Sequence, residues 1–298
     1  MQTTRTIDIN RFKNAVGFTA TFKAWGNRRK ADLNKVSTDA DKRRLSLSKE
    51  LIQAEEYDAI KRYMGELRQW IYSRTVPSFF KEGFQLASLE AVETIEQKMK
   101  QATEKDLPPL VSALQLVYAS KIDESRAALG DQFNAADYPT EEQLPQLFSI
   151  GWNWIAFTTP EALPPELRKA EEEKLQKQFA DAGEQITEAL RVAFSELITH
   201  ATERLTTAPG EKPKVFRDSL IGNIQEFLDT FNSRNLMNDT ELAAMVDKAR
   251  AVMVGVEPEK LRKYSDTRKQ VTEKLQEIKS AVDGMIETKK SRQFDFSE

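Results

Sequence analysis

Two short segments of the chain alternate between apolar and polar residues. In residues 16–22 every second side chain is apolar, and residues 148–156 repeat the pattern. This is the period of a half-buried β-strand. A lone strand would leave its backbone donors and acceptors unpaired, so we expect the two segments to pair with each other in a small two-stranded ribbon.

Most of the remaining chain has apolar residues three and four positions apart, which is typical of amphipathic helices. The spacing predicts helices over residues 55–74, 89–99, 107–130, 165–205, 216–231, 240–253 and 258–285. The fourth would be about 60 Å long at 1.5 Å per residue, and the last has the steps of an antiparallel partner for it. The predicted fold class is mainly α: an elongated helical bundle with long antiparallel coiled-coil-like helices and a two-stranded β ribbon.

Composition changes little along the chain, so the expected domain boundary depends on proline. Three prolines between residues 158 and 165 follow the second predicted strand. We place the boundary there, with residues 1–160 as a domain of strands and helices and residues 161–298 as a long-helix bundle. A single domain is the alternative.

The composition excludes several kinds of chemistry. The 298 residues contain no Cys and one His, His200, so cysteine nucleophiles, disulfides and multi-histidine metal sites are excluded. The chain also lacks the glycine-rich phosphate loop and the dinucleotide fingerprint. We expect no enzymatic activity, no cofactor and no metal ion, with a metal-dependent carboxylate enzyme as a minor alternative. His200 is expected to be a structural residue on the apolar side of its helix.

Neither a secretory signal nor a membrane span is expected. The first eleven residues carry charges without an apolar run, and no apolar stretch approaches the roughly 20 residues that cross a bilayer. The expected location is therefore the cytoplasm.

The first 50 residues are basic, with 12 Lys and Arg against 5 Asp and Glu. Cations beside an aromatic ring suit a nucleic-acid backbone with stacked bases, and they equally suit an acidic protein surface. The candidate contact residues for either partner are Lys23, Trp25, Arg28, Arg29 and Lys30. In the structural alternative, this is a solvated loop after a strand and Trp25 belongs to the core.

Several sequence blocks occur in an order that resembles a known family. They are Ala24-Trp25-Gly26, Leu129–Phe133 with Asp137–Pro139, Phe194–Leu205, Glu226–Asn235, and Ala249–Ala251 with Gly255-Val256. Over residues 14–288 the chain resembles the uncharacterised family catalogued as domain of unknown function 3150, found in phages, prophages and some mobile elements. The resemblance implies partners rather than a reaction: a MoxR-type AAA+ ATPase and a von Willebrand A-domain protein in the bacterial host.

The expected function is that of a non-enzymatic helical adaptor or substrate-presenting subunit of such a phage-encoded ATPase and A-domain system. A-domains commonly bind a ligand carboxylate through their metal ion, so an acidic loop is the candidate contact. Its carboxylates are Asp131, Asp137, Glu141 and Glu142.

Three alternatives remain. The acidic loop is also explained as a turn in which Thr140 and Gln143 form a capping box. The chain would otherwise be a nucleic-acid-binding accessory protein of phage replication or recombination, or an anti-defence protein that binds a host enzyme. A homo-oligomer is compatible with each of these functions.

Overall fold

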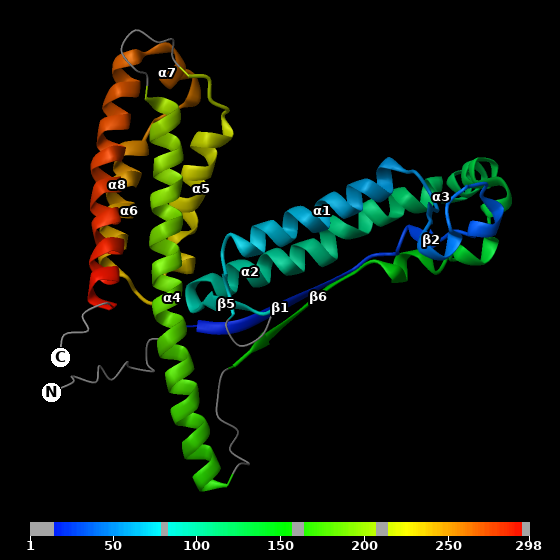
Figure 1. Ribbon diagram of the computed structural model, residues 1–298, viewed down its shortest axis with the longest axis horizontal. Coiled ribbons are helices and arrows are strands. Elements are labelled where there is room, and N and C mark those ends of the chain that lie inside the picture. The colour runs from blue at the N-terminus through cyan, green and yellow to red at the C-terminus, as the bar shows by residue number, and fades with distance from the viewer. Residues whose placement is uncertain (1–14, 79–82, 157–163, 207–213, 294–298) are drawn as a thin grey trace. The chain divides into compact units, whose positions relative to one another are not determined.

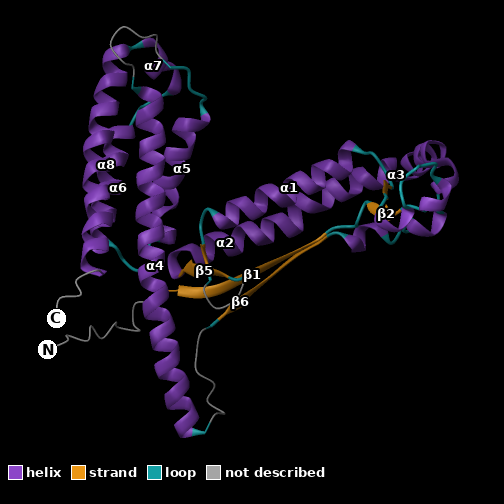
Figure 2. Ribbon diagram, viewed as in Figure 1, coloured by secondary structure: helices purple, strands orange, loops and turns teal. Residues whose placement is uncertain are grey.

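The chain folds into two compact, mainly helical units (Figure 1, Figure 2). The computed structural model describes residues 15–78, 83–156, 164–206 and 214–293. Unit 1 comprises the described residues of Met1–Gly17, Tyr72–Ala91 and Ile155–Glu298, and unit 2 comprises Phe18–Ile71 and Val92–Trp154. Unit 1 therefore combines segments from both sides of the proline-rich stretch after residue 157.

The two strands predicted from alternation are neighbours in one sheet. They are β1 (Ala15–Lys23) and β6 (Ser149–Ile155), and the full strand order is β4-β5-β1-β6. The prediction of a two-stranded ribbon was wrong, because β4 (Val76–Pro77) and β5 (Gln85–Ser88) extend the sheet. These strands are too short to show a period of two in the sequence.

A second small sheet was also missed. Strand β2 (Arg28–Lys30) pairs antiparallel with β3 (Ser48–Glu50), and Arg28 lies opposite Glu50. Both strands are three residues long and consist of polar side chains, so no apolar alternation marks them.

Three helices provide most of unit 2. They are α1 (Glu55–Tyr72), α2 (Leu89–Gln101) and α3 (Leu107–Leu129). Their predicted ranges are confirmed, and the Asp106 side chain makes no capping hydrogen bond at the start of α3. A π-helical turn over Ala102–Asp106 joins α2 to α3, and the Asp106 carboxylate instead accepts a hydrogen bond from the Tyr63 hydroxyl at 2.8 Å.

Five helices form the bundle of unit 1. They are α4 (Pro165–Leu205), α5 (Ser219–Arg234), α6 (Thr240–Met253), α7 (Pro258–Lys263) and α8 (Ser265–Gln293). The structure divides the single helix predicted from residue 258 into α7 and α8, because Tyr264 has extended backbone angles between them. Pro209 and Gly210, which indicate a turn after the fourth helix in the sequence, lie outside the described residues.

Helices α4 and α8 lie side by side in unit 1, as the spacing of their apolar residues predicts (Figure 1). The apolar faces of all five helices share one core, in which Phe194 of α4 stacks on Phe227 of α5 with ring centroids 5.0 Å apart. Across α4 and α8, the Ser195 hydroxyl donates to Asp283 at 2.5 Å. The bundle thus combines apolar burial with a polar contact between its long helices.

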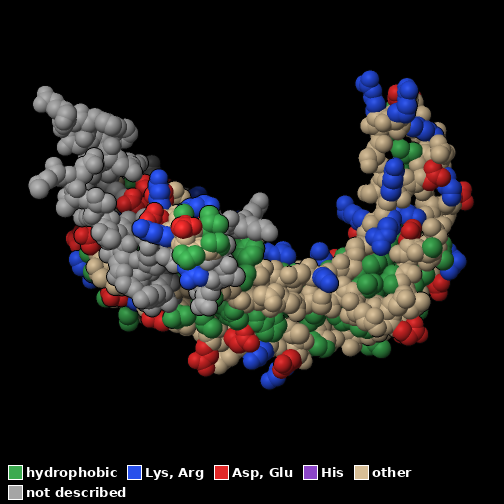
Figure 3. All heavy atoms as spheres, turned by 90° about the horizontal axis from the view of Figure 1, so that it is seen from below, with side chains coloured by type: hydrophobic (Ala, Val, Ile, Leu, Met, Phe, Trp, Pro, Cys, Tyr) green, Lys and Arg blue, Asp and Glu red, His purple; other side chains and the backbone are tan. Residues whose placement is uncertain are grey.

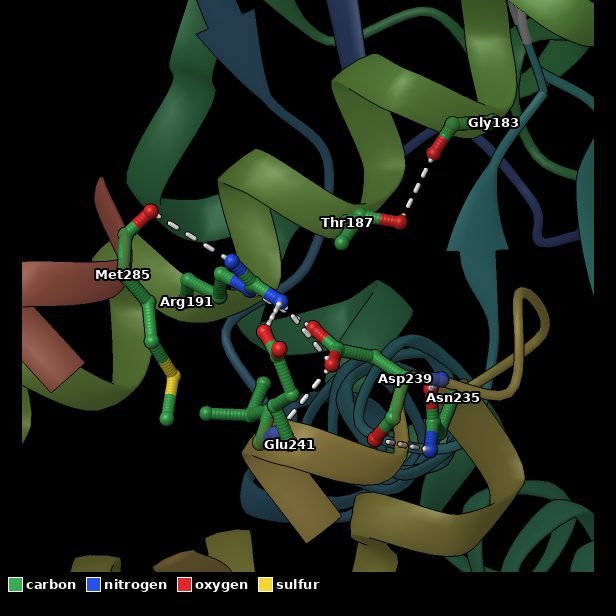
Figure 4. Close-up of polar contacts among 8 residues, drawn as sticks. Gly183, Thr187, Arg191, Asn235, Asp239, Glu241 and Met285 are labelled. Atoms are coloured by element: carbon green, nitrogen blue, oxygen red, sulfur yellow. Dashed lines mark hydrogen bonds and ion pairs between the residues drawn. The ribbon is translucent and has the colours of Figure 1, made fainter. Parts of the chain in front are cut away.

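A buried ion pair joins α4 to the start of α6 (Figure 4). The Arg191 guanidinium donates to both carboxylate oxygens of Asp239, at 2.6 and 3.0 Å, and to Glu241 at 3.0 Å. Asp239 also caps α6 by accepting the Leu242 N–H at 3.1 Å. Burial alone would raise the pKa of Asp239, but the hydrogen bonds from Arg191 and Leu242 outweigh it and lower that pKa.

Candidate functional site

Trp25, the aromatic residue of the candidate basic site, lies in the core of unit 2. Its side chain is 5% exposed and is surrounded by the rings of Tyr57, Tyr118 and Tyr138 at centroid distances of 5.9 to 6.4 Å. The Tyr57 hydroxyl donates to the Trp25 carbonyl at 2.8 Å, and burial raises the pKa of each tyrosine. Trp25 is therefore a core residue, as the structural alternative proposed, and its ring is not available to stack on a nucleic-acid base.

The basic segment after Trp25 is anchored by a buried asparagine. Asn27 donates its side-chain amide to the Ile52 carbonyl at 2.6 Å and accepts the Ile52 N–H at 2.9 Å. The Leu51 N–H in turn donates to the Asn27 carbonyl at 2.9 Å. These bonds fix the base of the β2–β3 hairpin and hold the intervening loop on unit 2.

The basic segment and the acidic loop, two separate candidate sites in the sequence, pack against each other. Asp32 and Gln132 exchange two hydrogen bonds: the Asp32 N–H donates to Gln132 Oε1 at 2.9 Å, and Gln132 Nε2 donates to the Asp32 carbonyl at 2.8 Å. The Lys49 ammonium donates to the Gln132 carbonyl at 2.5 Å and lies 2.7 Å from Asp137 Oδ2. Tyr138 completes the contact by donating to the Leu51 carbonyl at 2.8 Å.

We call this assembly, residues 27–51 and 130–143, the hairpin end. It contains eight Lys and Arg side chains and eight Asp and Glu side chains, so its formal net charge is zero. Side chains of both signs are visible on this end of unit 2, at the right of Figure 3. The excess positive charge of residues 27–51 is thus balanced by the carboxylates of residues 130–143.

The candidate cations have different environments. Lys23, Arg28 and Lys30 are exposed. Arg29 is partly buried, and its guanidinium donates to the carbonyls of Gly26 and Arg28 at 2.7 and 2.9 Å. Three cations of the predicted basic N-terminal segment, Arg5, Arg11 and Lys13, lie outside the described residues.

The candidate carboxylates divide in the same way. Asp137 is held by Lys49, whereas the side chains of Asp131, Glu141 and Glu142 are exposed. Of the two hydrogen bonds that make up the predicted capping box, the structure has the one in which the Thr140 N–H donates to Gln143 Oε1 at 3.2 Å. Hydrogen bonds from its own backbone N–H and from Thr140 lower the pKa of Glu142. This carboxylate is therefore ionised at neutral pH.

Sequence reasoning missed a polar contact between α2 and β6. The indole N–H groups of Trp152 and Trp154 both donate to Glu96 Oε2, at 2.7 and 3.0 Å. Hydrogen bonds from Trp154 and Trp152, with Lys100, lower the pKa of Glu96. Trp152 and Trp154 are two residues apart on a strand and so share a face, a signal that was available, but their common acceptor is distant in the sequence.

The described parts of the chain hold no group of three or more His, Asp or Glu side chains placed to bind a metal ion.

The expectation that His200 lies on the apolar side of its helix was wrong, because its side chain is exposed on α4 beside a polar hollow that Arg204 also lines. None of the helices in the described ranges is both long enough and apolar enough to cross a bilayer.

Comparisons with known proteins give no relative for this chain. It matches no protein-family model, no curated protein and no solved structure.

Proposed function

We propose that this protein is a non-enzymatic adaptor that docks on a protein partner through the hairpin end of unit 2. The observation that carries the proposal is the docking of the acidic loop on the basic segment, made by Lys49, Asp137 and the Asp32–Gln132 pair. It produces an anchored surface that exposes charges of both signs. Patterned charges of this kind select a complementary protein surface and fix its orientation.

The composition of the surface favours a protein partner over a nucleic acid. Exposed carboxylates lie on the same end as the exposed cations, and they would repel phosphates. Trp25 is buried and offers no stacking platform. Leu45 adds an exposed apolar side chain to the loop between β2 and β3, and apolar contacts within a polar rim are typical of protein interfaces.

The resemblance supplies the partners in this proposal, a MoxR-type AAA+ ATPase and a von Willebrand A-domain protein. For a carboxylate that reaches the metal ion of an A-domain, the suitable residues are Asp131, Glu141 and Glu142. Asp137 is unsuitable, because leaving its ion pair would strand the partly buried Lys49 ammonium.

Affinity capture of the tagged chain from its host, with and without nuclease, tests this proposal. We expect a protein partner that survives nuclease and is lost from two variants, D131N/E141Q/E142Q and R28Q/K30Q/R44Q. The matched controls change three exposed charges of each sign in unit 1, as E166Q/E173Q/D181N and K169Q/K177Q/K248Q. They should retain the partner. The proposal is rejected if nuclease removes every captured protein, or if all four variants capture the partner equally well.

A further inference from the structure

A hollow of about 440 Å³ lies in unit 1 between α4 and the segment that leads into β4. Its walls are mainly apolar and include Val76 and Pro77 of β4 and Ile186 and Leu190 of α4. Three further lining positions on α4 carry alanines, at 182, 189 and 193. Because alanine side chains fill little volume, the space between the helix and the strand stays open.

One cation lines this otherwise mainly apolar hollow. Arg234, in the last turn of α5, donates from Nη2 to the Thr230 hydroxyl at 3.2 Å and lies over the Phe227 ring at 4.5 Å. Its Nε is buried and has no hydrogen-bond partner within the described part of the chain. Arg234 also forms no ion pair with a carboxylate of that part.

The electrostatics of Arg234 favour an added anion. Burial lowers the pKa of Arg234, Glu226 raises it, and the neighbouring Arg74 lowers it further. A guanidinium remains charged throughout the physiological range. A partly desolvated cation at the wall of an apolar space is stabilised by a ligand that brings a negative charge of its own.

From the apolar walls and the single cation, we infer that this hollow binds a small amphipathic carboxylate, with its apolar body along α4 and its carboxylate at Arg234. The volume lies within the range of small-molecule pockets, about 300 to 1,000 Å³. This site belongs to unit 1 and does not depend on the proposed adaptor function.

Decanoate, below its critical micelle concentration, is a suitable probe for the full-length protein. Decan-1-ol and decyltrimethylammonium have the same apolar chain with a neutral or a positive head group. We expect chemical-shift changes in the methyl signals of Val76, Ile186 and Leu190, with decanoate binding at least about tenfold more tightly than either analogue. Tenfold corresponds to about 1.4 kcal/mol, at the lower end of a charge-assisted hydrogen bond.

Two variants separate the head-group contact from the apolar contact. Arg234→Gln should remove the preference for decanoate over decan-1-ol. Ala189→Phe, at an exposed position on the wall, should fill the hollow and weaken all three probes at least tenfold, and Lys248→Gln is the control for loss of an exposed cation. Equal affinities for the three probes, a preference that survives in Arg234→Gln, or unchanged binding by Ala189→Phe would each overturn the inference.

Discussion

Lys49 and Asp137 form an ion pair with an Nζ–Oδ2 distance of 2.7 Å, and their side chains are 8% and 20% exposed. One belongs to the basic segment and the other to the acidic loop. Their contact converts two apparent binding sites of opposite charge into one assembly with no net charge. The pair has a structural role, and the exposed charges around it remain available for a partner.

The Lys49–Asp137 pair should therefore contribute to the stability of unit 2. We expect Asp137→Asn to lower the free energy of unfolding by about 2 kcal/mol, because it leaves the Lys49 ammonium partly buried without its counter-charge. Urea unfolding of Lys49→Met, Asp137→Asn and the double variant measures the coupling between them. If the losses of unfolding free energy in the two single variants add up to the loss in the double variant, Lys49 and Asp137 do not interact.

Trp25 should act as a core residue. Trp25→Ala is expected to cost about 3 to 5 kcal/mol, as for other large-to-small changes in a packed core. Trp25→Phe should cost much less, since it keeps an aromatic ring among the three tyrosines and removes an indole N–H that has no partner among the described residues. Thermal unfolding compares the two variants. Equal, small losses would indicate that the ring is exposed.

The sequence predicts the helices better than it predicts the site. Helical periodicity locates α1 and α4 because their buried faces extend over several turns. The strands β2 to β5 contain two to four residues each, which is too short for any period to emerge. The site was predicted as two separate charged segments, because no local pattern reveals that Gln132 meets Asp32 or that Lys49 meets Asp137.

The Arg191–Asp239 pair should make the stability of unit 1 depend on pH. The folded state lowers the pKa of Asp239, so its contribution is complete above the unfolded value of about 3.9 and is lost as the pH falls through the lower folded value. We expect Asp239→Asn to lose about 3 kcal/mol at pH 7, because it leaves the partly buried Arg191 without its main counter-charge, while asparagine still caps α6. Urea unfolding at pH 7 and in steps below pH 4 measures this. If Asp239→Asn remains equally less stable than the wild type at the lowest pH, the ionisation of Asp239 does not stabilise the fold.

Glu96 should hold Trp152 and Trp154 in place on β6. Glu96→Ala removes the shared acceptor of both indole N–H groups, so we expect a red shift of the tryptophan emission and a lower midpoint of thermal unfolding. Glu93→Ala, one turn away on the exposed side of α2, is the control and should leave the emission unchanged. An unshifted spectrum for Glu96→Ala would show that the indoles do not depend on this carboxylate.

Site-specific photo-crosslinking tests the central claim most directly. A photoreactive amino acid in place of the exposed Leu45 reports on the hairpin end, and the same residue in place of the exposed Val254 reports on unit 1. After crosslinking in living cells and nuclease treatment, we expect a discrete protein adduct from position 45 that position 254 does not give. Adducts with nucleic acid alone, or the same proteins from both positions, would contradict a protein-binding role for the hairpin end.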